Sequence, residues 1–282
     1  MYFEGDAGMR GKKISKYVVF ALALLVTFLF VLPILWMISS SLKNNNEIFK
    51  FPPDLIPKYF KWNNYSESVK YIPFFKYLKN TILISVLSAI GTIISTPSIS
   101  YAFAKIKWKG RNFIFILVLS TLMLPFQVQI VPLYVLFKKI YWLGTILPLV
   151  VPNFFGNALY IFLLRQFMLR IPDEVSESAF IDGAGHFTIL TRVIIPFCYP
   201  AIFVIGLFTF LASWTDFFAP LVFLNNENTY TISLGLQQYS SVHHTQWAYM
   251  MAACSMFTIP VLILFFFTQR SLELGITFKG IK

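Results

Sequence analysis

The sequence predicts an all-α membrane protein with six transmembrane helices. Of its 282 residues, 57% are hydrophobic and only 12% are charged, and the mean hydropathy is +0.69. Soluble domains carry about 25% charged residues, so this composition indicates a chain that uses lipid as its solvent. The charged residues also leave long windows free of Asp, Glu, Lys and Arg. Each window exceeds the roughly 20 residues that a helix needs to cross a bilayer.

Six windows predict the spans in chain order. The first five contain no charged residue, and the sixth is the apolar end of a longer uncharged stretch. Because every backbone amide in lipid must find a partner within the protein, windows of this length indicate helices rather than barrel strands. The predicted spans are 17–42, 80–104, 112–137, 140–164, 193–215 and about 247–268. Prolines inside these spans predict kinks or breaks, which membrane helices tolerate.

The distribution of Lys and Arg predicts that both termini lie in the cytoplasm. With this orientation, 14 of the 23 basic residues lie inside, with tight clusters at 10–16 and 105–111. Seven of the other nine lie in one long outer loop, 43–79, whereas the outer loop at about 223–246 has none. The rule that Lys and Arg are enriched in cytoplasmic loops holds best for short loops. The chain is therefore predicted to lie in the inner cell membrane, with its polar loop 165–196 facing the cytoplasm.

One transmembrane domain, 17–270, is predicted between two cytoplasmic ends, 1–16 and 271–282. Residues 1–8 resemble an added leader, and Met9 would then be a native start. The net charge of +11 is concentrated at the ends of apolar runs. We assign it to membrane topology and to contacts with anionic lipid head groups rather than to nucleic acid.

Several kinds of chemistry are excluded by what the sequence lacks. It has no GxxxxGK[ST] phosphate loop and no GxSxG, HExxH or CxxC motif. Cys198 and Cys254 lack metal-ligand spacing and are interpreted as small apolar residues. Acidic residues are nearly absent from the spans, with Asp216 near the end of the fifth as the exception, whereas proton- or sodium-driven carriers usually need intramembrane carboxylates. The chain is therefore predicted to have no catalytic site, metal or cofactor of its own, and any solute movement would draw energy from a partner.

The most informative segment is the polar stretch 171–185, which holds the densest acidic cluster in the chain. Pro172 followed by Asp173 and Glu174 predicts a helix start, because proline suits the first turn and acids complement the helix dipole. Gly183 and Gly185 then predict a break, since Gly183 can adopt a backbone conformation that larger residues resist. A second apolar stretch, 187–195, would continue into the fifth span. The predicted result is a helix-turn-helix that moves together with that span.

The first of these two helices is predicted to dock on another protein. Val175, Ser178, Ala179 and Asp182 share one small-surfaced face, because they follow the i, i+3, i+4, i+7 spacing. The alternative is a connector helix that rests on lipid head groups. Such a helix should be basic and carry bulky apolar side chains, whereas this one is acidic and small, so docking is favoured.

The segment Glu177-Ser-Ala-Phe-Ile-Asp-Gly-Ala184, with Pro196 thirteen residues after Gly183, resembles the EAA loop of binding-protein-dependent ABC importer permeases. Ser178 replaces an alanine of the family pattern, and Ile195-Pro196 replaces Leu-Pro. The resemblance covers nearly the whole chain and is closest to the second permease subunit of maltose-type carbohydrate importers. Thr215 stands where the family usually has Asn. Further segments that carry the resemblance to this family are Leu32-Pro-Ile-Leu-Trp36, Met123-Leu-Pro125, Phe162-Leu-Leu-Arg-Gln166, Trp214-Thr-Asp-Phe217 and Tyr230-Thr231.

The resemblance implies the type I ABC importer permease fold, with the loop 171–196 as the coupling element. It further implies a second related permease subunit, a cytoplasmic pair of ABC ATPases that bind ATP and Mg, and an extracytoplasmic sugar-binding protein. Glu177 and Asp182 would pair with basic groups of the ATPase. Ser178, Ala179, Gly183 and Ala184 would complete the docking helix and permit close packing.

The translocation path is harder to assign. The candidate lining residues are the polar or aromatic groups within otherwise apolar helices: Gln127, Gln129, Asn153, Asn157, Trp214 and Asp216. Sugars bind amides and aromatic faces, but hydrogen bonds between helices explain each of these residues equally well. Both interpretations stay open here.

The function that the sequence favours is a carbohydrate importer permease for a di- or oligosaccharide. An ABC permease for another solute, such as a polyol or a glycerophosphodiester, is the alternative within transport. An ATP-independent channel or carrier is a further alternative. An intramembrane enzyme is disfavoured, because no pair of ionisable groups inside the spans can do acid–base work.

Overall fold

A computed structural model describes residues 5–240 and 245–276, and within these ranges every regular element is a helix. The chain divides into two compact units. The first comprises Met1–Ile72 with Gln238–Thr258, and the second comprises Pro73–Gln237 with Ile259–Lys282. The predicted all-α class is confirmed. Residues 1–4 and 277–282 of the two predicted cytoplasmic ends lie outside the described residues.

The first unit is built on one long apolar helix, α1 (Gly5–Ser41). Its membrane-spanning part is Lys16–Ser41, and none of its most apolar window is buried within the chain. A helix that is apolar on all sides and unburied requires lipid or another protein around it. The Asn64 side chain closes the end of α1 by donating to the carbonyls of Ser41 and Lys43, both at 2.8 Å. This replaces partners that the last turn of a helix lacks.

Two short helices and the start of α14 complete the first unit. They are α2 (Asn45–Ile48), α3 (Asn63–Tyr71) and α14 (Trp247–Ile276), which continues beyond this unit. The carboxamide oxygen of Asn45 accepts from the backbone N–H of Ala248 at 2.9 Å. A side-chain acceptor at this place satisfies one of the unpaired N–H groups of the first turn of α14.

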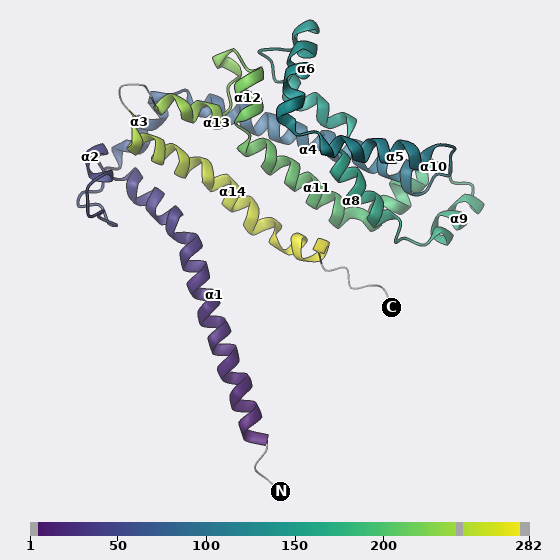
Figure 1. Cartoon of the computed structure of the whole chain (residues 1–282), viewed down its shortest axis with the longest axis horizontal. Coiled ribbons are helices and arrows are strands. Elements are labelled where there is room, and N and C mark those ends of the chain that lie inside the picture. Colours follow the sequence, from purple (N-terminus) through teal and green to yellow (C-terminus); the bar gives the residue numbers. More distant parts are fainter. Residues whose placement is uncertain (1–4, 241–244, 277–282) are drawn as a thin grey trace. The chain divides into compact units, whose positions relative to one another are not determined.

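The second unit packs three helices side by side: α4 (Phe74–Ala104), α8 (Ala158–Met168) and α11 (Ile195–Thr215) (Figure 1). Helix α4 is rich in buried hydroxyl groups that reach neighbouring backbone. Ser95 donates to the carbonyl of Asn153 at 3.0 Å, and Ser100 donates to that of Ile161 at 3.1 Å. Small polar residues of this kind let membrane helices approach closely and hold them by hydrogen bonds.

The third predicted span, 112–137, is not one straight helix. It consists of α5 (Arg111–Ser120), the 3-10 turn η1 (Thr121–Met123) and α6 (Phe126–Lys139), with a bend of 102° at the break. Pro125 causes the break, because it has no N–H to continue the helix and forces Leu124 into an extended conformation. The pair is either a broken span or a re-entrant segment, so the described residues contain five helices that are long and apolar enough to span a membrane, or six if the pair counts as one span.

The fourth predicted span, 140–164, is displaced toward the C-terminus and interrupted. The observed span is Leu147–Met168, made of α7 (Leu147–Val150), the 3-10 turn η2 (Val151–Phe155) and α8. Gly156 interrupts it with a φ of +90°, a conformation that favours glycine. The Asn157 side chain then restarts the helix by accepting from the N–H of Leu159 at 2.9 Å.

The remaining elements of the described chain are short. They are α9 (Asp173–Ile181), α10 (His186–Thr188), the π-helical segment η3 (Ile189–Ile194), α12 (Phe218–Phe223), η4 (Glu227–Thr229), α13 (Ile232–Gly235) and η5 (Leu236–Tyr239). The predicted spans 17–42, 80–104 and 247–268 correspond to observed helices. The predicted span 193–215 begins earlier, because His186–Thr215 is continuous.

We predict that Gly206→Leu destabilises the contact between α4 and α11. A Cβ at Gly206 would lie 2.6 Å from Cδ1 of Ile93, so a larger side chain cannot fit without displacing that residue. Overpacking of this kind costs about 1–3 kcal/mol. Thermal unfolding in detergent should show a lower midpoint for Gly206→Leu, and adding Ile93→Ala should recover part of the loss. An unchanged midpoint for the single variant would show that the two helices are not in close contact.

Candidate functional site

The loop 171–196 forms the helix-break-helix that the sequence predicts. Helix α9 begins at Asp173 directly after Pro172, and it ends at Ile181. The N–H of Ala184 donates to the carbonyl of Ala179, and that of Gly183 donates to the carbonyl of Phe180, both at 3.0 Å. These two bonds form a Schellman motif, which requires a left-handed residue just after the helix. Gly183 supplies it with a φ of +83°.

Only one of the two glycines is needed for the backbone conformation. Gly185 has a φ of −77°, which any residue can adopt, and a Cβ there would meet nothing within 4 Å. After it, α10, η3 and α11 run without interruption, so the second predicted helix is part of the fifth span. The π-helical segment η3 lies where the loop enters that span. π-Helical segments are rare in proteins, and those that occur are often found at functional sites.

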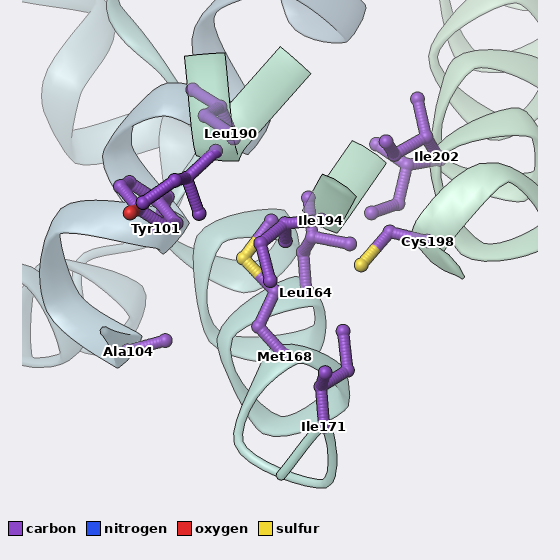
Figure 2. Packing of buried hydrophobic residues seen from close by; sticks show 11 residues of the cluster. Tyr101, Ala104, Leu164, Met168, Ile171, Leu190, Ile194, Cys198 and Ile202 are labelled. Carbon is purple, nitrogen blue, oxygen red and sulfur yellow. The ribbon is translucent and has the colours of Figure 1, made fainter. Parts of the chain in front are cut away.

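A buried apolar cluster lies beneath the loop and fixes its position (Figure 2). Leu164 and Met168 of α8 meet Ile194 and Cys198, and the side chains of these four residues are fully buried. Tyr101 and Ala104, from the end of α4, complete the cluster on another side. Loop residues Val175, Ala179 and Ala184 pack against it and are half-buried. Part of the small-surfaced face of α9 is therefore used for packing inside this chain.

The opposite surface of the loop is exposed and combines acidic with bulky apolar side chains. Glu177, Ser178 and Asp182 are exposed, and Glu177 and Asp182 form no ion pair within the described part of the chain. Ile181 is 87% exposed and Phe187 is 78% exposed, on either side of the Gly183 break. The sequence argument missed these two residues because it considered only the small face. Two large apolar residues flanking a helix break in a polar loop were the available signal.

One ion pair connects the start of α9 to the end of α4. Nζ of Lys105 lies 2.6 Å from Oδ1 of Asp173 and also donates to the carbonyl of Ile171. The Lys105 side chain is 4% exposed, whereas that of Asp173 is 65% exposed. The hydrogen bond from Lys105, followed by the positive charge of Lys105, lowers the pKa of Asp173 from its ordinary value.

A second candidate site is a cavity of about 390 Å³ in the second unit. Of the predicted path residues, it brings together Asn153 and Asp216, and it adds Ser213 as a third polar group. Oδ1 of Asp216 accepts from the N–H groups of Phe218 and Ala219 at 3.0 and 3.2 Å, so it also caps α12. The other lining residues are apolar: Phe126, Leu133, Phe137, Pro148, Leu149, Pro152, Ala212, Ala219 and Phe223.

The other four predicted path residues do not line this cavity. Gln127 is exposed, and Trp214 is buried beneath the surface. Gln129 donates to the carbonyl of Leu124 at 2.7 Å across the bend, and Asn157 caps α8. Gln129 and Asn157 therefore satisfy backbone groups that the proline and glycine breaks leave unpaired.

The helices and the exposed loop define a multi-pass membrane protein whose polar loop is continuous with a span. The chain belongs to the family described as the binding-protein-dependent transport system inner membrane component, whose model matches residues 94–277. It is therefore a transport component that works with a binding protein and not an enzyme, as the EAA-like loop predicted.

Relatives and solved structures agree with this family. The chain is 29% identical over 281 residues to the trehalose/maltose transport system permease protein MalG of Thermococcus litoralis, covering 97% of this chain and 99% of that protein. It is also 29% identical over 263 residues to the arabinooligosaccharides transport system permease protein AraQ of Halalkalibacterium halodurans, covering 91% and 93%. A crystal structure of a bacterial ABC transporter that imports alginate contains a chain of the same fold. That chain has a TM-score of 0.80 and 22% identity, and the match covers 93% of this chain and 97% of that one.

We predict that Asp173→Asn destabilises the chain in a pH-dependent way. The pKa of Asp173 is lower in the folded chain than its ordinary value of 3.8. The ion pair therefore stabilises the fold above about pH 4 and is lost as the pH falls through the native pKa. Because Asp173 is largely exposed, the expected loss at pH 7 is only about 0.5–1 kcal/mol.

Thermal unfolding of both proteins in detergent at pH 7 and pH 3 measures this effect. At pH 7 the wild type should unfold at a higher temperature than Asp173→Asn, and this difference should shrink at pH 3. Asp182→Asn is the matched control, because Asp182 is exposed and forms no ion pair within the described residues. A difference in unfolding temperature that is equal at both pH values would mean that the charge of Asp173 does not cause it.

Proposed function

We propose that this chain is one of two permease subunits of an ABC importer for a di- or oligosaccharide. It forms half of the translocation path, and ATP hydrolysis takes place in separate cytoplasmic ATPase subunits that bind ATP and Mg. The observation that carries the proposal is the loop 171–196, which presents exposed acidic and apolar residues on α9 and at the start of the helical segment that continues into α11. The carbohydrate class is supported by relatives named for trehalose, maltose and arabinooligosaccharides.

The exposed surface of α9 is suited to a protein partner. Burying a side chain such as Ile181 contributes about 1.5–3 kcal/mol, and Phe187 adds a second apolar anchor. Glu177 and Asp182 would flank these anchors and pair with basic groups of the ATPase, while Gly183 keeps the turn compact. Ala179 and Ala184 contribute indirectly, because they let α9 lie close to its own core.

The proposed orientation follows from this docking. If the ATPases bind α9, the loop 171–196 and both termini face the cytoplasm, and the loop around 224–237 faces outward toward the binding protein. The apolar surface of α1 would then contact lipid and the second permease subunit. We also propose that the cavity with Asn153, Ser213 and Asp216 borders the sugar path, because its few polar groups offer hydrogen bonds within an apolar wall.

Reconstitution tests the proposed function directly. The chain should be co-expressed with the second permease, ATPase and binding protein encoded beside it, and placed in liposomes. We expect uptake of radiolabelled trehalose, maltose or arabinotriose that requires both ATP and the binding protein. Uptake that is indifferent to ATP would indicate a channel or carrier, and ATP-dependent uptake of a polyol or glycerophosphodiester alone would replace the sugar.

We predict that Ile181→Ser weakens the association with the ATPase. Losing the burial of this side chain should cost about 1.5–3 kcal/mol, or roughly tenfold or more in affinity. Titration of the ATPase onto detergent-solubilised permease measures the affinity.

Ile56→Ser is the matched control for Ile181→Ser, since Ile56 is 73% exposed in the predicted outer loop. It should leave ATPase affinity unchanged. Equal affinities for wild type, Ile181→Ser and Ile56→Ser would mean that the ATPase does not use this surface of α9.

A further inference from the structure

The last turn of α4 holds the coupling helix α9 near both of its ends. Tyr101 and Lys105 lie four residues apart at the end of α4, so their side chains share one face. Lys105 contacts the chain at the start of α9, and Tyr101 contacts His186, just after its end. We call these two contacts the α4 clasp.

The Lys105 side of the clasp is buried and has two bonds. Nζ of Lys105 bonds both the Asp173 carboxylate and the carbonyl of Ile171, so it fixes the backbone on the approach to α9 as well as its first residue. A lysine whose side chain is 4% exposed must remain paired, because an isolated buried charge is costly. Separation of α9 from α4 would leave this buried ammonium without either partner, although its pair with the largely exposed Asp173 is weak by itself.

The Tyr101 side of the clasp joins hydrogen bonding to ring packing. The Tyr101 hydroxyl lies 3.2 Å from Nδ1 of His186, within hydrogen-bonding distance. The His186 ring also packs edge-on against Phe180, with ring centroids 4.9 Å apart. Because Phe180 belongs to α9, the C-terminal half of this helix is linked through His186 to α4.

The covalent connection from α9 to α11 is a short turn that contains two glycines. It passes through Gly183, Ala184 and Gly185, and a side chain at either glycine would contact nothing within 4 Å. Glycine has the largest backbone freedom of any residue. The turn can therefore bend, and α9 is held in place by its packing against η3 and by its contacts with the end of α4.

Helix α4 extends from the clasp to the opposite end of the second unit. Its 31 residues span about 45 Å at 1.5 Å per residue. At the far end, Asn80 donates to the carbonyls of Asn228 and Tyr230 at 2.9 and 3.0 Å. Thr81 accepts there from the N–H of Ile232 at 2.9 Å. One helix thus connects the coupling loop with the loop that we propose to face the binding protein.

We propose that Lys105 and Tyr101 are positioning residues that make α4 move as one body with α9. This proposal rests on the proposed function, because it assumes that an ATPase displaces α9. In this proposal, α4 transmits the displacement of α9 toward residues 226–232. Lys105 thereby has a role in transmission besides its contribution to membrane topology.

Distance measurements between spin labels on α9 and α4 test the proposal. The labels go on Glu174→Cys and Phe75→Cys, both exposed positions, in the complete complex with Cys254→Ser. Cys198 is fully buried and stays. The distance distribution is recorded without nucleotide and with ATP, Mg and vanadate. We expect one narrow distribution in both states of the wild type.

The variants separate the clasp from general effects of charge. Lys105→Met should broaden the distribution and make it shift with nucleotide by about 2 Å or more, the size of helix displacements in switching proteins. Lys105→Arg should restore wild-type behaviour. Lys109→Met is the control, because Lys109 is exposed in the same loop and forms no ion pair within the described residues. Tyr101→Phe should give a smaller broadening, since it removes only the hydroxyl.

The outcomes distinguish this proposal from the proposed function. A Lys105→Met complex that behaves as wild type in both nucleotide states overturns the clasp. If Lys105→Met does not assemble, the double variant Asp173→Asn with Tyr101→Phe takes its place, and wild-type distances in that variant overturn the proposal. If the ATPase never associates with the wild-type chain, the proposed function fails. The clasp is then judged by whether Lys105→Met broadens the distribution in the permease alone.

Discussion

The loop 171–196 depends on the burial of a few small side chains against the cluster at the ends of α4, α8 and α11. A helix of nine residues is marginal by itself, so α9 needs this contact to exist. Val175, Ala179 and Ala184 supply it by packing against the buried cluster. Because the inner side of α9 is committed to the core, the outer side is free to carry Glu177, Ile181 and Asp182. The same helix is thus held to its own chain on one side and exposed on the other.

A second constraint is the requirement of lipid that every backbone polar group be paired. The described spans contain breaks at Pro125 and Gly156, and each leaves backbone groups to satisfy. Gln129 and Asn157 meet this need beside their respective breaks. Polar residues within apolar helices therefore have two uses, and whether the residue lines the cavity separates them. Asn153 and Asp216 also bond to backbone, but unlike the other two they face a cavity.

Charge-free windows predicted the helical class, and at 17–42, 80–104 and 247–268 they also predicted the spans. The third and fourth windows were wrong in detail, because hydropathy averages over backbone breaks that single prolines and glycines decide. Pro125 was visible as a possible kink, but its angle of 102° depends on what α5 and α6 pack against. The loop helix was predictable because Pro172, Asp173 and Gly183 act through local backbone rules. The exposure of Ile181 and Phe187 was not, since it follows from which faces of α9 and α10 meet the core.

The basic cluster 105–111 shows how one set of charges can meet two requirements. In the sequence these residues indicate which side of the membrane the loop occupies, and for that purpose they are interchangeable. In the structure they are not, because Lys105 is buried against Asp173 and Ile171 whereas Lys109 is exposed. Lys105, which the charge pattern uses to predict orientation, lies one turn from Tyr101, where α4 meets the loop 171–196. The predicted orientation and the observed attachment of the loop therefore involve the same helix end, so an altered α4 terminus is expected to disturb both.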